Sequence, residues 1–193
     1  MTDSLYLQLQ RYLWLPARYA HSGWFRLLGV DPEKQPVRGT LRQSLLNRAL
    51  RGLRGMPVLD ASLTRRQQQL AQMDVQGLSR YALALGLLRL DCNDYFLLPA
   101  YRQVLYSWFD ETLLWQMFGV SRGIGTASLS PEVLVSRATS TGIAILQRMA
   151  CAEPVLYAML ILLPPVTRAL WPPVSPRKIA LLESMLCPSL PCH

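Results

Sequence analysis

Apolar residues recur at helical spacing along most of the chain, and this spacing limits its fold more than any other feature. In SWFDETLLWQM, at 107–117, they return four or five positions apart, as on one side of a helix, rather than forming the unbroken β-branched run of a buried strand. The longest apolar run, VLYAMLILL at 155–163, ends before Pro164 and is well below the roughly 20 residues that span a bilayer. We therefore predict a mainly α-helical fold with no membrane insertion.

Prolines, glycines and capping residues divide the sequence into an expected seven to nine or so helices within one compact domain of residues 1–193. Helices are expected at 17–29, 40–55, 63–90, 100–118, 131–150 and 175–186, with Gly77 as a candidate break in the third. Segments 4–15 and 155–163 are left open between helix and strand, and connections are expected at 31–39, 55–62 and 171–176. Residues 1–66 form a strongly basic N-terminal part, and residues 174–193 a C-terminal helix with a frayed tail.

Three glycines fall at the spacing of the nucleotide-binding loop of short-chain dehydrogenases: Gly119, Gly123 and Gly125. Such a loop must lie between a buried strand and a helix, because the pyrophosphate rests on the helix N-terminus. Here the preceding segment has helical spacing, and the next helix is expected only at 130–131. Neither lysine of the chain has a tyrosine four positions before it, as those enzymes require. We interpret Gly119 as a helix end that leads into a glycine-rich connection, and we predict no cofactor.

Catalytic residues are scarce. The chain has two histidines, and because His193 is terminal, a nucleophilic triad would have to be built on His21, whose neighbours indicate only a helix turn. The tail CPSLPCH at 187–193 matches no zinc-site spacing, and the four cysteines are expected to be free thiols in a reducing compartment. The acid pairs at 91 and 94 and at 110 and 111 are explained as helix N-terminal or solvent-facing charges. We expect no enzyme and no catalytic or metal-binding residue.

The surface is expected to be short of charge. Hydrophobic residues make up 51% of the chain and charged residues 17%, which excludes a largely disordered protein and suggests that a partner covers part of the surface. Four aromatic side chains of the segment 107–118 share helical spacing, and we expect most of them in the core with one or two exposed as interface anchors. These four are Trp108, Phe109, Trp115 and Phe118.

Positive charge is concentrated at the beginning of the sequence. The net charge is +8, and its carriers are 18 arginines and two lysines. Residues 1–66 hold 11 basic and 4 acidic side chains, a net +7, whereas residues 67–193 hold 9 and 8, a net +1. Arginine binds carboxylate, phosphate and aromatic groups with its planar guanidinium, so this choice favours a binding role over simple solubility.

The helix expected at 40–55 carries part of this charge. Arg48, Arg51 and Arg54 share one half of its helical wheel, and six apolar residues occupy the other half. The six are Leu41, Leu45, Leu46, Ala49, Leu50 and Leu53. A basic amphipathic helix suits nucleic-acid phosphates, an anionic membrane surface or an acidic protein partner, and it also suits the solvated outer face of a packed helix. RNA-recognition, helix-turn-helix and zinc-finger patterns do not occur, which weakens the nucleic-acid interpretation.

Several short elements, in order along the chain, resemble those of the SctK proteins (the YscK and PscK group) of bacterial type III secretion systems. PARYAH at 16–21 is similar to their P-A-x-Y-x-H element, and LGLLRL at 85–90 to their leucine-rich L-G-L element. DETLLWQM at 110–117 and LSPEVLVSRATSTGIAIL at 129–146 resemble their E-T-L-x-Q and L-P-x-E-x-x-S-R segments. Glu153-Pro154 and the apolar run before Pro164 resemble their final elements. The arginine-rich helix and the glycine connection depart from the family.

This resemblance implies a non-enzymatic helical adaptor of the cytoplasmic sorting platform. Such a protein joins the cytoplasmic domain of the inner-membrane ring protein (SctD-like) to the pod protein (SctQ-like), at the cytoplasmic face of the inner membrane. We expect Arg48, Arg51 and Arg54 to meet acidic groups on one of these partners, and no nucleic acid to bind. Two alternatives remain: a helical nucleic-acid-binding regulator, and an oxidoreductase that binds its cofactor at 119–125.

Overall fold

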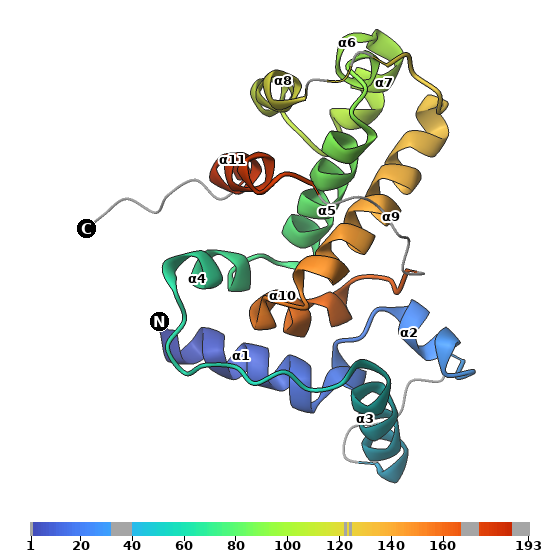
Figure 1. Cartoon of the computed structure of the whole chain (residues 1–193). Helices are drawn as coiled ribbons and strands as arrows, with labels where there is room; N and C mark the ends of the chain where they lie inside the picture. The colour runs from blue at the N-terminus through green and yellow to red at the C-terminus, as the bar shows by residue number, and fades with distance from the viewer. Residues whose placement is uncertain (1, 32–39, 122, 124, 167–173, 187–193) are drawn as a thin grey trace. The chain divides into compact units, whose positions relative to one another are not determined.

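The computed structural model describes residues 2–31, 40–121, 123, 125–166 and 174–186. All regular structure in these ranges is helical, with eleven α-helices, two short 3₁₀ helices and no strand (Figure 1). The predicted mainly α fold is therefore confirmed. Three expected features lie outside the described residues, wholly or in large part: the connection at 31–39, the connection at 171–176 and the tail at 187–193.

The chain divides into two compact units, and each is described by itself. Unit 1 contains residues 1–75 and 147–167, and unit 2 contains residues 76–146 and 168–193. The helices of unit 1 are α1 (Thr2–Trp14), η1 (Pro16–Arg18), α2 (Ser22–Leu27), α3 (Leu41–Arg54), α4 (Arg65–Ala71), α10 (Pro154–Met159) and η2 (Leu160–Leu162). Unit 2 contains nearly all of α5 (Val75–Leu90) and α9 (Pro131–Met149), together with α6 (Asp94–Leu97), α7 (Pro99–Leu105), α8 (Glu111–Val120) and α11 (Pro176–Leu186).

Unit 1 is built around one of the two segments that the sequence left open between helix and strand; the other, 4–15, lies almost wholly in helix α1. The segment 155–163 is the helix α10 followed by the 3₁₀ turn η2, and almost all of it is buried. Helices α1 and α4 both pack against α10. The turn also receives main-chain and side-chain bonds from the first helices: the backbone N–H of His21 donates to the carbonyl of Ile161 at 2.9 Å, and the indole N–H of Trp24 donates to the carbonyl of Leu163 at 2.8 Å. Residues far apart in sequence therefore close this unit.

The core of unit 2 is the close contact between α5 and α9. A Cβ atom placed on Gly86 of α5 would lie 1.8 Å from the carbonyl oxygen of Ala138, and one placed on Gly142 of α9 would lie 1.7 Å from that of Ala82. Two helix backbones can approach so closely only where side chains are absent. Every residue of 81–88 is buried. The LGLLRL element and the small residues of 129–146 thus have a packing explanation.

Helix breaks differ from the expected positions, which raises the helix count above the seven to nine expected. The segment 63–90 breaks at 72–74 and not at Gly77, which lies inside α5. The segment 100–118 breaks before Asp110, whose carboxylate accepts the N–H of Leu113 at 2.7 Å and caps α8. An N-cap acceptor supplies a partner for an otherwise unsatisfied N–H, so it favours a new helix start. Helix α11 begins at Pro176 as predicted.

No helix among the described residues is long and apolar enough to cross a membrane.

Candidate functional site

The glycine connection does not have the surroundings of a nucleotide loop. Gly119 lies in the last turn of helix α8, so a helix and not a strand leads into it. Gly123 is buried, and a Cβ atom there would lie 1.4 Å from the carbonyl oxygen of Asp91. Asp91 ends α5 with a φ of 48°, a left-handed conformation that Asp tolerates better than most residues. The glycine at 123 is therefore explained by close backbone packing.

Side chains of α6 and α7, with Cys92 just before them, hold the rest of this connection. The carboxylate of Asp94 accepts the N–H of Ala127 at 3.0 Å, and the hydroxyl of Tyr95 accepts the N–H groups of Ser128 and Leu129 at 3.3 and 3.2 Å. The thiol of Cys92 donates to the carbonyl of Gly125 at 3.0 Å. A bound phosphate would need backbone N–H groups of this kind, but these groups already donate to side chains of the protein. We conclude that the connection has a structural role.

His21, the histidine on which a catalytic triad would depend, is the N-cap of α2. Its Nδ1 accepts the N–H of Gly23 at 3.1 Å, which requires the neutral imidazole at that nitrogen. Partial burial lowers the pKa of His21, and the positive charge of Arg26 lowers it further. Its place in the fold gives it a capping function.

The three arginines predicted to bind a partner have three different environments. Arg48 is exposed. Arg51 is half-buried, with its guanidinium carbon 5.4 Å from the ring centroid of Trp14. The guanidinium carbon of Arg54 lies 5.5 Å from the ring of Trp24 and 5.1 Å from that of Tyr157. The three do not form one solvent-facing row.

Arg54 is held inside unit 1. Its guanidinium donates to the carbonyl of Tyr157, and burial lowers its pKa to about 10, an effect that the neighbouring tyrosine opposes. Loss of hydration destabilises a buried cation, and the two aromatic faces and the carbonyl offset that loss. Arg54 therefore joins α3 to α2 and α10.

The apolar half of the α3 wheel is mostly outside the core. Of its six members only Leu46 and Leu50 are buried. Asn47 is buried between them, and its Oδ1 accepts the N–H of Ala17 at 2.9 Å. This bond and the burial of Arg54 set the rotation of the helix about its axis. The expectation that the wheel separates an apolar packed half from a basic solvated half is therefore wrong for this helix.

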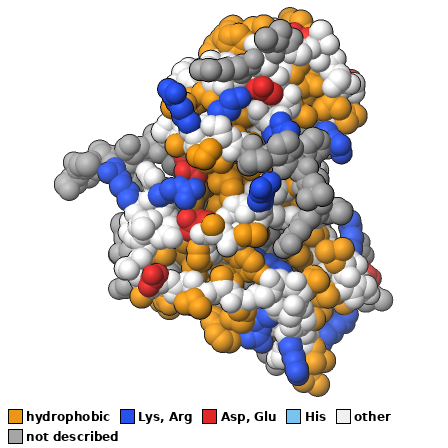
Figure 2. Space-filling view, viewed as in Figure 1, with side chains coloured by type: hydrophobic (Ala, Val, Ile, Leu, Met, Phe, Trp, Pro, Cys, Tyr) orange, Lys and Arg blue, Asp and Glu red, His pale blue; other side chains and the backbone are white. Residues whose placement is uncertain are grey.

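The rotation leaves an apolar row on the solvent side of α3. Leu41 is 77% exposed, Leu45 56% and Leu53 55%, and Ala49 completes the spacing of four. Two exposed arginines flank the row, Arg42 on one side and Arg48 on the other, as the helical wheel places them. We call these six residues the α3 surface. Figure 2 shows basic and hydrophobic side chains intermixed over this helix, in the lower part of the view.

Unit 2 carries a second exposed cluster, which we call the aromatic surface. Tyr106 and Trp115 are each 46% exposed, and the guanidinium of Arg102 lies over both rings, 5.5 and 5.1 Å from their centroids. Arg102 also pairs with Glu111 at 2.8 Å. Tyr, Trp and Arg are the residue types most enriched among energetically dominant interface residues. Most of the four aromatics of 107–118 were expected in the core, but only Phe109 is buried. Trp108 and Phe118 are partly exposed, and Trp115 is the most exposed of the four.

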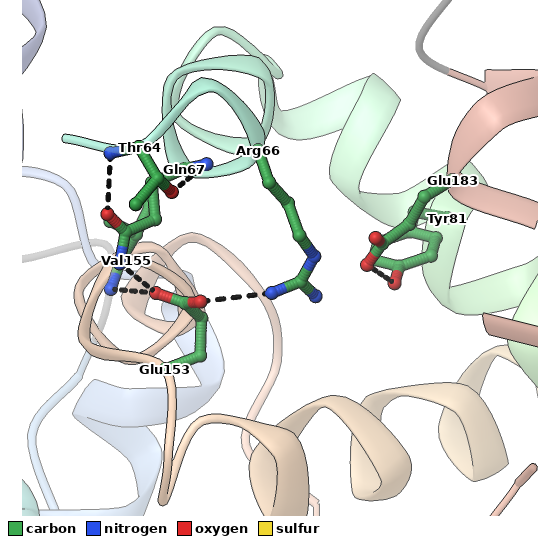
Figure 3. A network of polar contacts seen from close by, with 7 residues as sticks. All are labelled: Thr64, Arg66, Gln67, Tyr81, Glu153, Val155 and Glu183. Atoms are coloured by element: carbon green, nitrogen blue, oxygen red, sulfur yellow. Dashed lines mark hydrogen bonds and ion pairs between the residues drawn. The ribbon is translucent and has the colours of Figure 1, made fainter. Parts of the chain in front are cut away.

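A polar network around Glu153 was not anticipated from the sequence (Figure 3). Its carboxylate pairs with Arg66 at 3.0 Å, accepts from the amide of Gln67 at 3.0 Å and caps α10 through the N–H of Val155 at 3.4 Å. Gln67 also forms a capping box with Thr64 at the start of α4. The Thr-x-x-Gln spacing at 64–67 is the signal that could have indicated this helix start. The network joins two helices separated by more than 80 residues.

In the part of the chain that the structure describes, all regular structure is helical, and the polar side chains named above cap helices or join them. A family model for a type III secretion system subunit matches residues 7–165 of the chain. The chain belongs to this family of type III secretion system subunits. No curated protein and no solved structure matches it significantly.

Proposed function

We propose that this protein is a non-enzymatic adaptor of the SctK type, which links the inner-membrane ring of the secretion apparatus to the pods of its cytoplasmic sorting platform. The observation that carries the proposal is the family match over 7–165, taken with the order of the SctK-like elements within it. Its partners would be a pod protein (SctQ-like) and the cytoplasmic domain of a ring protein (SctD-like), and its place the cytoplasmic face of the inner membrane.

The elements that carry the resemblance have structural positions rather than chemical ones. Pro16 begins η1 and His21 caps α2. Glu153 caps α10, and the first four residues of LGLLRL, 85–88, are buried in α5. A shared pattern of caps and close packing supports a shared fold. It is also consistent with a protein that works by binding and not by catalysis.

The two exposed clusters support a protein that docks at more than one surface. The α3 surface offers charge for orientation and fast association, and the aromatic surface offers large side chains for a long-lived contact. Of the arginines expected to meet acidic groups, Arg48 and Arg51 remain available for this role, because Arg54 is held between two rings.

Charge reversal tests this proposal. We expect the purified chain to bind both the ring domain and the pod protein, and the Arg48→Glu/Arg51→Glu pair to weaken one of the two interactions about tenfold or more at low salt. Arg65→Glu, on the exposed first position of α4 in the same unit, is the matched control and should bind normally. Normal binding of both partners by the double variant would remove the arginines from the interface, and no binding by the wild type would refute the adaptor role.

Nucleic-acid binding is the alternative, and the arginine excess is the observation that favours it. The exposed leucines beside Arg48 are not needed for phosphate contact, which is why we prefer a protein partner. A gel shift with duplex DNA distinguishes the two. Binding that falls about 1000-fold between 50 and 200 mM salt would support the alternative.

A further inference from the structure

We propose that the α3 surface binds an amphipathic helix of a partner protein, one with an apolar row that meets the leucines and with acidic residues along its edges. The inference rests on the proposed function, because it takes the partner from the same secretion apparatus, and it adds the surface and the chemistry of the contact.

The geometry of the row favours a helix as the occupant. Leu41, Leu45, Ala49 and Leu53 are spaced four apart, so they form one of the inclined ridges that fit between the side chains of a second helix. Three of the four are among the large hydrophobic residues that unit 1 exposes by more than half. A row of this kind costs solubility if it stays in water, whereas a facing helix would bury it.

Gly52 supplies an independent observation. It lies inside α3 on the same side as the row, three positions after Ala49, and among the described residues nothing outside its own stretch of helix lies within 4 Å of where its Cβ would be. Gly86 and Gly142 are explained by backbones that approach them within the chain, but none of the described residues approaches Gly52 in this way. Glycine weakens a helix relative to alanine, so its presence at an open site fits a partner backbone that approaches there.

The charges on α3 indicate which residues the partner helix carries along its edges. α3 contains no acidic residue, and the exposed Arg42 and Arg48 lie on opposite sides of the row. Residues 1–66 as a whole carry a net +7. Asp or Glu at the flanks of the partner helix would complement both arginines. A second copy of α3 would instead bring arginine against arginine, which disfavours self-association through this face.

A lipid surface is the other class of occupant that a basic amphipathic helix suggests. Helices that lie in a membrane interface carry large apolar residues, commonly including aromatics, over a broad face. The exposed row of α3 is narrow and has no aromatic residue. These features favour the protein partner.

Three variants of the full chain test the inference against the purified ring domain and pod protein. We expect Leu45→Gln to weaken binding of one of them about tenfold, while Leu27→Gln, on the 62% exposed Leu27 of α2, leaves it unchanged. We expect Arg42→Glu/Arg48→Glu to weaken the same interaction and to reverse its salt dependence between about 50 and 300 mM, because salt screens the new like-charge repulsion. Thermal unfolding of each variant shows that it is folded.

Gly52→Ala gives the sharpest result, because stability and binding should change in opposite directions. Alanine should raise the midpoint of thermal unfolding by about 1–4 °C, since it favours the helix at an open site. The same methyl group should weaken partner binding severalfold. If the variant lost binding because it folded poorly, both the midpoint of thermal unfolding and the affinity for the partner would decrease.

The outcomes separate the two proposals. Wild-type chain that binds neither protein would overturn the adaptor role and this inference together. Binding that survives in Leu45→Gln and Gly52→Ala would overturn this inference alone. Leu45-dependent co-sedimentation with phosphatidylglycerol vesicles, or Leu45-dependent dimers in sedimentation velocity, would also overturn it, in favour of a lipid surface or a second copy.

Discussion

The guanidinium carbon of Arg54 lies 5.1 Å from the ring centroid of Tyr157, and the same guanidinium donates to the main-chain carbonyl of that tyrosine. One side chain thereby joins the last turn of α3 to α10, which follows about 100 residues later. The ring of Trp24 lies on the same guanidinium at 5.5 Å. An arginine that would be assigned to the surface by its charge is a central contact of unit 1.

We predict that Arg54→Met lowers the free energy of unfolding by about 2–3 kcal/mol, because it removes a charged hydrogen bond and two desolvated cation–π contacts. Arg54→Lys should lose much of the same amount, since an ammonium lacks the planar face. Arg48→Met, on the exposed side of the same helix, should stay within about 0.5 kcal/mol of wild type. Urea denaturation followed by circular dichroism measures all three, and equal losses for Arg48→Met and Arg54→Met would contradict the assignment.

Gly86→Ala and Gly142→Ala are each expected to destabilise the protein by about 3 kcal/mol or more, because a methyl group would overlap a carbonyl of the facing helix. Gly119→Ala is the control, because among the described residues nothing outside its own stretch of α8 lies within 4 Å of its Cβ position. That change should be neutral or stabilise by up to about 1 kcal/mol. Thermal and urea unfolding would show the contrast, and similar values for the three variants would mean that α5 and α9 are not so closely packed.

The helical class and most helix positions could be predicted from the sequence, because periodicity and end signals both report on local structure. Helix α3 begins after Thr40 and ends before Gly55, and α9 begins at Pro131, all as expected. The break before α8 was missed, although Asp110 is a good N-cap. Aromatic residues on both sides of that break maintain an apparent helical period.

The proposed binding surface could be predicted only in part. The sequence indicates the arginine-rich helix, but a helical wheel does not say which side of it packs. Here Asn47 turns inward to satisfy the backbone N–H of Ala17, and Arg54 turns inward to meet two rings. Both contacts join residues far apart in the sequence, so they cannot be predicted from a local sequence pattern. The exposed row could not be predicted for the same reason: long-range contacts decide which leucines of α3 pack. In the sequence, Leu46 and Leu50 look equivalent to Leu45 and Leu53.

Substitutions of Glu153 can separate its contribution as the cap of α10 from its contribution to the ion pair with Arg66. Glu153→Gln keeps a side-chain acceptor for the N–H of Val155, and we predict a cost below about 1 kcal/mol, because the Arg66 partner is 45% exposed and solvent screens the ion pair. Glu153→Ala removes the cap as well and should cost about 1–2 kcal/mol. Arg66→Ala should resemble the glutamine variant. The three are compared by urea denaturation at low and high salt, and an Arg66→Ala cost equal to that of Glu153→Ala would show that the ion pair dominates.

His21 should make stability depend on pH in the mildly acidic range. Its pKa in the folded chain is lowered from 6.5 by partial burial and then by Arg26. The unfolded chain therefore binds the proton first as the pH falls, so the contribution of His21 to stability is complete above about pH 6.5 and decreases below it. Protonation at Nδ1 would also remove the acceptor for the N–H of Gly23.

His21→Asn isolates this effect, because asparagine can cap a helix but does not titrate. We expect the stability of the wild type relative to His21→Asn to decrease between pH 7.5 and 5.5, measured by thermal unfolding in matched buffers. An NMR titration in a His193→Gln background leaves a single histidine, and its pKa should lie below 6.5. A pKa above this value, with stability rising toward pH 5.5, would mean that the imidazolium and not the neutral ring is favoured at the start of α2.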